Sequence, residues 1–449
     1  YKGGSVLFSD PTNIEKQILQ IFNLASEITV FNKPEKNIVI VYKLSFKEAL
    51  YDFLHGIELA SPQDIDVSPT TLIIKYMYER IDSHEFNDET QIFSAIASST
   101  DGNNIFPISP NHIYSEIIQT SEGERTTIGN SFFELLRKFG LIEEHNTYIA
   151  ALKLEREEDI VEVEVQAGYQ HSIIIMEMID GDTLDKRLTF FEDSVVYVLP
   201  EELSFTFDKN FLRRFFTLYL LTLLAQKGYS HGDSHTGNIM LTRPSSSSFF
   251  KNSLGDLLTR HNMNVVPYII DFGEGALLTS LTFEELSEEI LSEVKRIFPF
   301  YHSLYDNVCR TVQVRLIISI INEYLRYHKY VEAILITTMC SSNRKNSMFQ
   351  KALKHHTSAY NHLFTINEEE AEILNSLIKQ AIDDRKILET RLQRWQIKPV
   401  PKKQRSSGGH YQKKINNTRK IKKLKKIKTR KIRKIRKIRK IRKTRKTRN

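Results

Sequence analysis

Cysteine and tryptophan are scarce in this 449-residue chain, which contains two cysteines and one tryptophan. Cys309 and Cys340 cannot build the disulfide framework of a small secreted domain, so a reducing, intracellular compartment is expected. Long apolar runs are also missing, because the best one, Phe215 to Ala225, has about half the length that a membrane-spanning helix needs. The chain begins with Tyr1 rather than Met, which leaves room for a preceding segment with a targeting signal.

Acidic residues are absent from the end of the chain, since residues 413–449 hold 22 Lys or Arg and no Asp or Glu. Subtracting these 22 from the 63 basic residues leaves 41 against 55 acidic residues, a net charge of −14 for residues 1–412. The formal net charge of +8 therefore describes neither part. The pattern predicts an acidic globular body that carries a strongly basic tail.

Short β-branched runs mark the first part of the chain, and helical patterns mark the last part. Strands are expected near 38–44, 71–76, 161–165, 172–179, 239–241 and 265–270, and helices near 87–97, 131–139, 209–227 and through most of 283–394. The helix near 209–227 is almost wholly apolar, with Asp208 as its N-cap and Gly228 at its end. We expect an α+β protein with a small strand-rich lobe followed by a helical lobe.

Three segments carry chemistry in an informative order. The run Met176 to Gly181 comes first, His231-Gly232-Asp233-Ser234-His235-Thr236-Gly237-Asn238 follows the apolar helix, and Asp271-Phe272-Gly273 ends an apolar strand. Phosphoryl transfer from ATP needs one carboxylate for the acceptor hydroxyl, and a second carboxylate with an amide oxygen for Mg²⁺. It also needs an apolar site with backbone groups for adenine.

At these residues the sequence resembles the protein-kinase-like superfamily, because His-x-Asp-x-x-x-x-Asn and Asp-Phe-Gly stand in the same order. The resemblance covers roughly residues 70–280. It implies a two-lobed kinase-like fold, ATP and Mg²⁺ as cofactors, Asp233 as catalytic base, and Asn238 and Asp271 as metal ligands. Glu177 and Met178 match the hinge residues whose backbone meets adenine.

The resemblance also implies a phosphate-binding lysine on an upstream strand and a glutamate partner on the following helix. Lys75 fits best, with Glu89 fourteen residues later as its partner and Glu85 as second choice. Lys43 is the runner-up lysine, because it lies on a good strand without a well-spaced helical glutamate after it.

Several departures from the protein-kinase pattern point to a divergent member. No Gly-x-Gly-x-x-Gly loop precedes Lys75, Gly3-Gly4 lies far upstream, and Gly232 stands where protein kinases have arginine. The His-Gly-Asp-x-His-x-Gly-Asn form looks like aminoglycoside phosphotransferases and the ubiquinone-biosynthesis kinase-like family. The stretch around Lys75, followed by Phe106 to Pro110, also looks like kinase-like proteins of large DNA viruses.

Two alternatives stay open at this point. Alternating His231, Asp233 and His235 could converge on zinc, although His231 is better read as a residue that bonds the loop backbone. The basic tail repeats Ile-Arg-Lys four times from Ile432 to Lys443. Its charge should keep it disordered in isolation and bind polyanions such as nucleic acid by counterion release.

These patterns predict a kinase-like N-lobe at 1–180, a helical C-lobe at 181–395, a linker at 396–412 and the basic tail at 413–449. The expected function is that of an ATP- and Mg²⁺-dependent phosphotransferase, a divergent protein serine/threonine kinase. The alternatives are a small-molecule hydroxyl kinase and a pseudokinase scaffold with a polyanion-binding tail. The expected acceptor is a protein rather than a small molecule, and the expected location is the cytoplasm or nucleus, with a virion or host cell as further options.

Overall fold

The computed structural model describes residues 11–32, 39–47, 71–81, 85–97, 108–110, 112–158, 168–189, 191, 195–198, 204–243, 249–250, 253–281, 292, 314–340 and 362–396. The chain divides into two compact units, Tyr1–Trp395 and Gln396–Asn449, and every described residue except Gln396 belongs to the first unit. The basic tail at 413–449 lies outside the described residues.

A five-stranded antiparallel sheet forms the first part of the fold. Its strands are β1 (Glu27–Asn32), β2 (Val39–Ser45), β3 (Thr71–Arg80), β4 (His112–Gln119) and β5 (Tyr169–Glu177). The spatial order is β1-β2-β3-β5-β4, so the last strand in sequence lies between β3 and β4. The strands expected near 38–44, 71–76 and 172–179 are confirmed as β2, β3 and β5.

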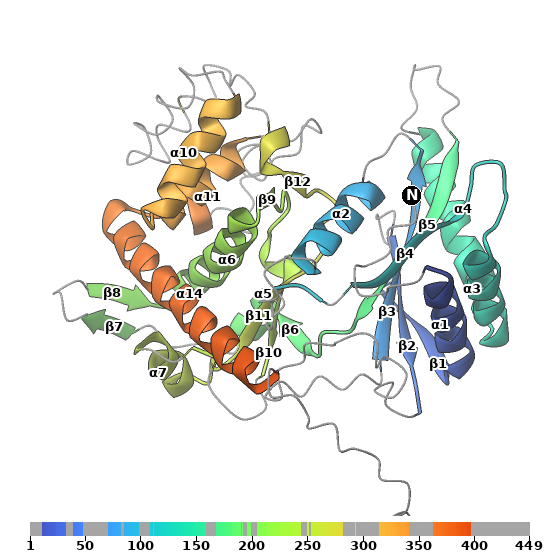
Figure 1. Cartoon of the computed structure of the whole chain (residues 1–449), viewed down its shortest axis with the longest axis horizontal. Helices are drawn as coiled ribbons and strands as arrows, with labels where there is room; N and C mark the ends of the chain where they lie inside the picture. The colour runs from blue at the N-terminus through green and yellow to red at the C-terminus, as the bar shows by residue number, and fades with distance from the viewer. Residues whose placement is uncertain are drawn as a thin grey trace, which may run out of the picture. The chain divides into compact units, whose positions relative to one another are not determined.

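Successive side chains of a strand point to opposite faces of the sheet, and each face here has its own apolar core. Tyr42, Ile74 and Ile175 lie on the face that packs against α1 (Pro11–Leu24), α3 (Thr127–Lys138) and α4 (Ile142–Glu158). Figure 1 shows these three helices together on one side of the sheet. These helices therefore shield this face of the sheet from water.

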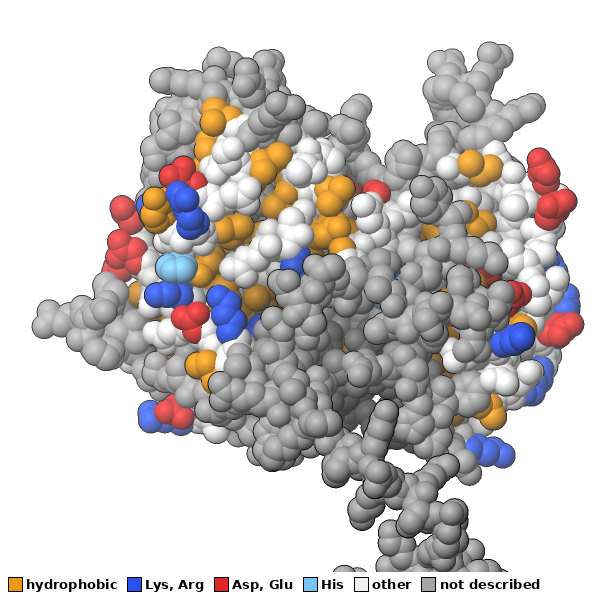
Figure 2. Space-filling view, in the orientation of Figure 1, with side chains coloured by type: hydrophobic (Ala, Val, Ile, Leu, Met, Phe, Trp, Pro, Cys, Tyr) orange, Lys and Arg blue, Asp and Glu red, His pale blue; other side chains and the backbone are white. Residues whose placement is uncertain are grey.

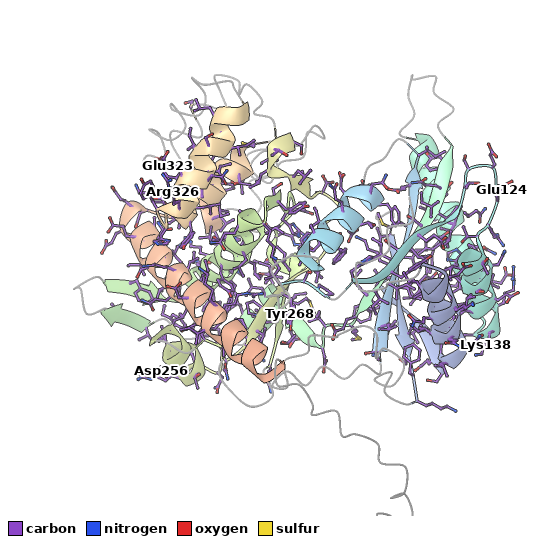
Figure 3. All side chains as sticks on the ribbon, in the orientation of Figure 1. Glu124, Lys138, Asp256, Tyr268, Glu323 and Arg326 are labelled. Atoms are coloured by element: carbon purple, nitrogen blue, oxygen red, sulfur yellow. The ribbon has the colours of Figure 1, made fainter. Side chains whose placement is uncertain are left out.

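The outward sides of these helices are polar. Figure 2 shows Lys, Arg, Asp and Glu side chains along this side of the protein, and Glu124 and Lys138 are labelled there in Figure 3. A helix with one apolar and one charged face is stable at a surface, because its apolar face packs while the charged face is solvated.

Helix α2 (Glu85–Ala97) covers the opposite face of the sheet. Phe86, Phe93 and Ile96 of this helix share a core with Met77 of β3 and Ile174 of β5. The spacing of these helix residues places them on one side, as expected of an amphipathic helix. The helix expected near 87–97 is therefore confirmed.

Helix α6 (Lys209–Gln226) is the centre of the larger core. The Asp208 carboxylate accepts a hydrogen bond from the Phe211 backbone N–H at 2.7 Å, and Gly228 follows the helix with a φ of +86°. Both predicted ends of this helix are thus confirmed. The helix packs against α11 (Tyr330–Met339), and none of the described helices combines the length and apolar character that a membrane crossing needs.

The remaining elements are short pieces around α6 and two further helices. They are β6 (Gly181–Thr183), α5 (Leu184–Leu188), β7 (Val195–Val198), β8 (Ser204–Phe207), β9 (Tyr229–Ser230), the 3₁₀ turn η2 (Thr236–Asn238), β10 (Ile239–Thr242), α7 (Ser253–Arg260), β11 (Val266–Ile269), β12 (Ala276–Leu277), the 3₁₀ turn η3 (Leu278–Ser280), α10 (Val314–Arg326) and α14 (Glu368–Gln396). Strand β10 pairs with both β6 and β11, and β12 pairs with β9. The expected strands near 239–241 and 265–270 are therefore confirmed.

Some expectations were incomplete. Residues 98–130 were expected to form loops around short strands, but β4 is eight residues long and α3 begins at Thr127. The mixed helix and strand signals of residues 1–70 gave no bounds for α1, and α4 and the β7–β8 hairpin were not predicted. The strand expected near 161–165 lies outside the described residues, as does Cys309, whereas Cys340 is a buried free thiol.

Candidate active site

The alternation of β3 places Lys75 on the sheet face that α2 covers. Its cross-strand partners are Val41 and Ile174, and Ile174 belongs to the core on that face. The Lys75 Nζ lies 2.6 Å from the Glu89 Oε2 of α2, and the two side chains are 9% and 0% exposed. A buried lysine and a buried glutamate are thus paired across the sheet–helix interface.

Asp271 joins this pair from the other end of the chain. The Lys75 Nζ lies 2.8 Å from the Asp271 Oδ1, although the Asp271 side chain is 51% exposed. Of the two carboxylate partners of Lys75, Asp271 is therefore the one that solvent reaches, while the buried Lys75–Glu89 pair holds the ammonium in place.

The charges of the three groups depend on one another. Burial alone would lower the pKa of the Lys75 ammonium, but attraction to Asp271 and Glu89 outweighs it and raises that pKa above its ordinary value. Attraction to Lys75 lowers the pKa of Asp271 to about 2. Burial raises the pKa of Glu89, and Lys75 opposes that rise only in part. Lys75 and Asp271 are therefore both charged at neutral pH.

The segment 231–238 is held against the end of β11 by backbone contacts. The Ile270 N–H donates to the Asn238 carbonyl at 2.9 Å, and the His231 Nε2–H donates to the Ile270 carbonyl at the same distance. The His231 Nδ1 accepts the backbone N–H of Asp233 at 3.3 Å. These bonds bring the residues on either side of Asp233 next to Asp271.

Gly232 is required by this arrangement. Its φ is +76°, and a Cβ at this position would lie 2.0 Å from the Glu274 carbonyl oxygen. Any side chain would therefore both strain the backbone and clash with it. The fold therefore gives a steric reason for glycine at position 232.

Asp271 itself has a left-handed backbone, with a φ of +64°. This conformation costs a non-glycine residue roughly 1–2 kcal/mol, so the surroundings must hold it. The neighbouring Phe272 is fully buried, with its ring 5.1 Å from the rings of Phe93 and His231. The packing of Phe272 thus anchors the turn that presents the Asp271 carboxylate to Lys75.

Asn238 has a defined orientation. Its Nδ2 donates to the Asp233 carbonyl at 2.8 Å, so its Oδ1 points away from that carbonyl. The amide oxygen of Asn238 and the carboxylate of Asp271 stand at the ends of adjacent strands, because Ile239 pairs with Ile269 in the β10–β11 ladder. Carboxylate and amide oxygens are the ligands that Mg²⁺ prefers, so this donor set fits that ion.

Glu177 and Met178 lie where the chain leaves the five-stranded sheet. Glu177 is the last residue of β5 and pairs with Leu72, and residues 178–180 lie outside any strand before β6 begins. Residues 178–180 therefore connect the sheet that carries Lys75 with the sheet that leads to Asp271. Tyr268 of β11, labelled in Figure 3, belongs to the second sheet. Burial and the nearby Glu177 raise the pKa of Tyr268, whereas Arg385 of α14 opposes that rise.

Sequence comparisons with known proteins do not assign the chain to a family. No protein-family model and no curated protein matches the chain. Among solved structures, the chain is similar to one described as "ROP18 kinase domain in complex with AMP-PNP and sucrose", with 9% identity over 86% of this chain and 92% of that chain. The TM-score is 0.28, which is too low to establish a common fold. The function of the chain must therefore be inferred from its own geometry.

Among the predicted site residues, Lys75, Glu89 and Asp271 converge directly, and Asn238 and Asp233 lie on one loop bonded to the strand before Asp271. The carboxylate partner of Lys75 is Glu89 rather than Glu85. Asp271 contacts Lys75 rather than the runner-up Lys43. The roles of these residues stay predictions, but their placement agrees with a single site.

The zinc alternative was wrong for His231. Both of its ring nitrogens are engaged by backbone groups, and burial lowers its pKa, so it stays a neutral structural residue. In the part of the chain that the structure describes, no group of three or more His, Cys, Asp or Glu side chains could hold a metal ion.

One positioning contact was not predicted from the sequence. The Thr236 hydroxyl donates to Asp185 of α5, and Asp185 also lies 3.3 Å from Arg213 of α6. This pairing ties the turn that carries Asn238 to the helix after the 178–180 segment. The only signal for it was an isolated aspartate beside a lysine and an arginine, which is common on protein surfaces.

Proposed function

We propose that this protein is an ATP- and Mg²⁺-dependent phosphotransferase with a kinase-like, two-lobed organisation. The observation that carries the proposal is the convergence of Lys75, Glu89 and Asp271, which come from a strand, a helix and a loop far apart in sequence. A lone lysine on a strand is commonplace. A buried lysine held between a buried glutamate and a half-exposed aspartate is an arrangement suited to binding phosphate groups.

Lys75 supplies the phosphate contact. An ammonium has three N–H donors, of which Glu89 and Asp271 accept two, so the third can reach an oxygen of a triphosphate. Because Glu89 is buried and Asp271 is half exposed, Asp271 is the partner that yields when a phosphate arrives. Glu89 keeps the lysine aimed at the same point.

Asp271 and Asn238 would hold Mg²⁺, with the carboxylate and the amide oxygen as ligands. The Lys75, Glu89 and Asp271 group carries one more negative than positive charge when both carboxyls are ionised. A divalent cation is therefore attracted to the Asp271 side of the group. When bound, the ion neutralises charge on the transferred phosphoryl group.

Asp233 orients the acceptor hydroxyl and takes its proton. The hydroxyl oxygen attacks the γ-phosphorus, the bond from that phosphorus to the β–γ bridging oxygen breaks, and ADP leaves. The proton passes from the hydroxyl to Asp233 and then to solvent. The backbone groups of Glu177 and Met178 hold adenine in this scheme.

The proposed acceptor is a protein hydroxyl, because residues 413–449 add an electrostatic contact that suits a macromolecular partner. A small-molecule acceptor is the alternative within the same chemistry. The tail itself is proposed to bind a polyanion such as nucleic acid through its 22 basic residues.

The test is transfer of the γ-phosphate of labelled ATP by the wild-type chain to a panel of protein and small-molecule acceptors. Asp233→Asn should abolish transfer and leave ATP binding intact. The matched control is Asp256→Asn on α7, an exposed aspartate labelled in Figure 3, which should behave as wild type. A wild-type chain that binds ATP and phosphorylates nothing in the panel, itself included, contradicts the proposal.

A non-catalytic scaffold is the second candidate, and one observation favours it. The connection between β1 and β2 is residues 33–38, Lys-Pro-Glu-Lys-Asn-Ile, which contain no glycine. A phosphate-covering loop normally uses glycine so that its backbone can approach the phosphates closely. Gly3-Gly4 precedes α1 and so lies outside this connection. ATP binding without transfer would favour the scaffold.

A further inference from the structure

His235 has both of its ring nitrogens placed by the fold. It is the N-cap residue of the η2 turn, and its Nδ1 accepts the Gly237 backbone N–H at 3.0 Å. A Cβ on residue 237 would lie 2.7 Å from the Cε1 of the His235 ring. Glycine at 237 therefore allows the ring to lie flat against the turn.

This hydrogen bond determines which nitrogen carries the proton. Because the Nδ1 accepts an N–H, the neutral ring must be protonated on Nε2. The His235 Nε2 lies 4.0 Å from the Asp233 Oδ2, and the two side chains are 37% and 24% exposed. The ring thus has its N–H donor on the nitrogen that lies near the carboxylate of Asp233.

The Asp233 backbone is already fixed on both sides. Its N–H donates to the His231 Nδ1, and its carbonyl accepts from the Asn238 Nδ2. An aspartate χ2 has a broad distribution, so the direction of the carboxylate depends on the side chains around it. A base that must accept a proton from one direction needs rotation about χ2 restricted.

We propose that His235 is a positioning residue that orients the Asp233 carboxylate, with the Nδ1 anchored to the turn and the Nε2–H facing the base. The proposal rests on the proposed function, because it assigns a partner to the base of that reaction. His235 itself donates no proton and forms no bond to phosphorus. The distance of 4.0 Å is longer than a hydrogen bond, so the interaction is a charge–dipole attraction between the carboxylate and the ring N–H rather than a direct bond.

The competing explanation is that His235 only caps the turn. Two substitutions separate the two roles, because each keeps one end of the ring. In His235→Asn the amide oxygen replaces the Nδ1 as acceptor for the Gly237 N–H, and the distal donor is lost. In His235→Gln the amide N–H₂ reaches the place of the Nε2, and the cap is lost.

The measurements are kcat for phosphate transfer, the ATP dissociation constant and the unfolding midpoint. We expect His235→Asn to keep the wild-type midpoint and ATP affinity while kcat falls about tenfold, a part of the 10²–10⁴ that a positioned base supplies. We expect His235→Gln to lose stability and to keep more kcat than His235→Asn. The reverse order, with His235→Asn active as wild type and His235→Gln impaired, overturns the proposal.

A spectroscopic measurement tests the proposal even if the wild type transfers no phosphate. Such an absence of transfer would count against the proposed function and not against the position of the His235 ring. Long-range ¹H–¹⁵N spectra of histidine-labelled protein, assigned with His235→Asn, should show His235 protonated on Nε2. Asp233→Asn should shift that Nε2 resonance, and Asp256→Asn should leave it unchanged. A ring protonated on Nδ1, or one insensitive to Asp233→Asn, overturns the proposal.

Discussion

Lys75 shows how a single residue gains meaning from its position in a strand. The alternation of β3 sends Leu72, Ile74 and Tyr76 into one core and Lys75 towards the other, where an ammonium is costly unless it is paired. The pairing with Glu89 could be proposed from a spacing of fourteen residues. The contact with Asp271 could not, because it depends on how the strands and the 231–238 loop come together.

Lys75→Met should destabilise the protein by about 3 kcal/mol at pH 7, because the buried Glu89 loses its cation. The control Lys43→Met, on the neighbouring strand β2, should change stability by no more than about 0.5 kcal/mol. Denaturant unfolding measures both. The deficit of Lys75→Met should shrink as pH falls, because burial raises the pKa of Glu89 and the variant lacks the Lys75 charge that opposes this rise, so protonation relieves the variant more than the wild type. Equal losses in the two variants would show that Lys75 is not buried against Glu89.

His145 is a second residue whose burial has a measurable consequence. Burial lowers its pKa to about 4, with His171 and Arg125 acting in the same direction, and its Nδ1 lies 2.7 Å from the Tyr42 hydroxyl. Between pH 6.5 and 4 the unfolded chain therefore binds more protons than the folded chain. The stabilising effect is complete above the unfolded pKa of about 6.5 and is lost as pH falls towards 4.

The wild type should accordingly lose stability between pH 7 and pH 4.5, with about 3 kcal/mol of the total loss below pH 6.5 attributable to His145. His145→Gln keeps a hydrogen-bonding partner for Tyr42 and removes the titration. Its unfolding free energy should fall less steeply over the same pH range. Parallel curves for wild type and His145→Gln would mean that His145 titrates alike in the folded and unfolded chains.

Helices and strands with strong local signals were predictable from the sequence. Helix α6 has an N-cap aspartate, an apolar interior and a terminal glycine, and the structure confirms all three features. Helix α4 was missed because Ile142–Glu158 carries charges around most of its circumference and shows no clear apolar stripe. The order of the sheet was also beyond local patterns, since β5 pairs between β3 and β4 across an intervening pair of helices.

Gly232→Ala tests the tight turn that precedes Asp233. The backbone strain of a positive φ adds to a Cβ placed 2.0 Å from the Glu274 carbonyl, so we expect a loss of about 4 kcal/mol or more. Gly140→Ala is the matched control, because Gly140 has a φ of +73° but open space around its Cβ position. Its expected cost is about 1–2 kcal/mol, from backbone strain alone. Similar losses in both variants would contradict the close approach of Glu274.

At the scale of the whole molecule, charge composition alone separates the acidic body from the basic tail, because residues 413–449 contain no acidic side chain. The boundary between the compact units at residues 395 and 396 falls at the end of α14, just before the proline-containing segment that was expected to be a linker. The division of residues 1–395 into lobes, in contrast, depends on contacts far apart in sequence and stays a prediction.

Deletion of residues 413–449 should leave the unfolding midpoint of the remaining chain unchanged, because a segment with 22 basic and no acidic residues is not expected to pack into an apolar core. It should also remove salt-sensitive binding to heparin and single-stranded DNA, since 22 basic residues are lost. Binding measured at several salt concentrations checks this. A truncated protein that binds either polyanion as tightly as the full chain would place the polyanion site on the body.

The measurement that tests the central claim most directly is thermal unfolding with and without Mg²⁺ and ATP, on wild type, Asp271→Asn and the control Asp256→Asn. A ligand at about 100 times its dissociation constant stabilises the folded state by roughly 2.7 kcal/mol, which is easily seen. The account predicts a Mg²⁺-dependent rise in the midpoint for wild type and Asp256→Asn, and its loss in Asp271→Asn. No rise at saturating Mg-ATP, or an equal rise in all three proteins, would contradict a nucleotide site built on Lys75 and Asp271.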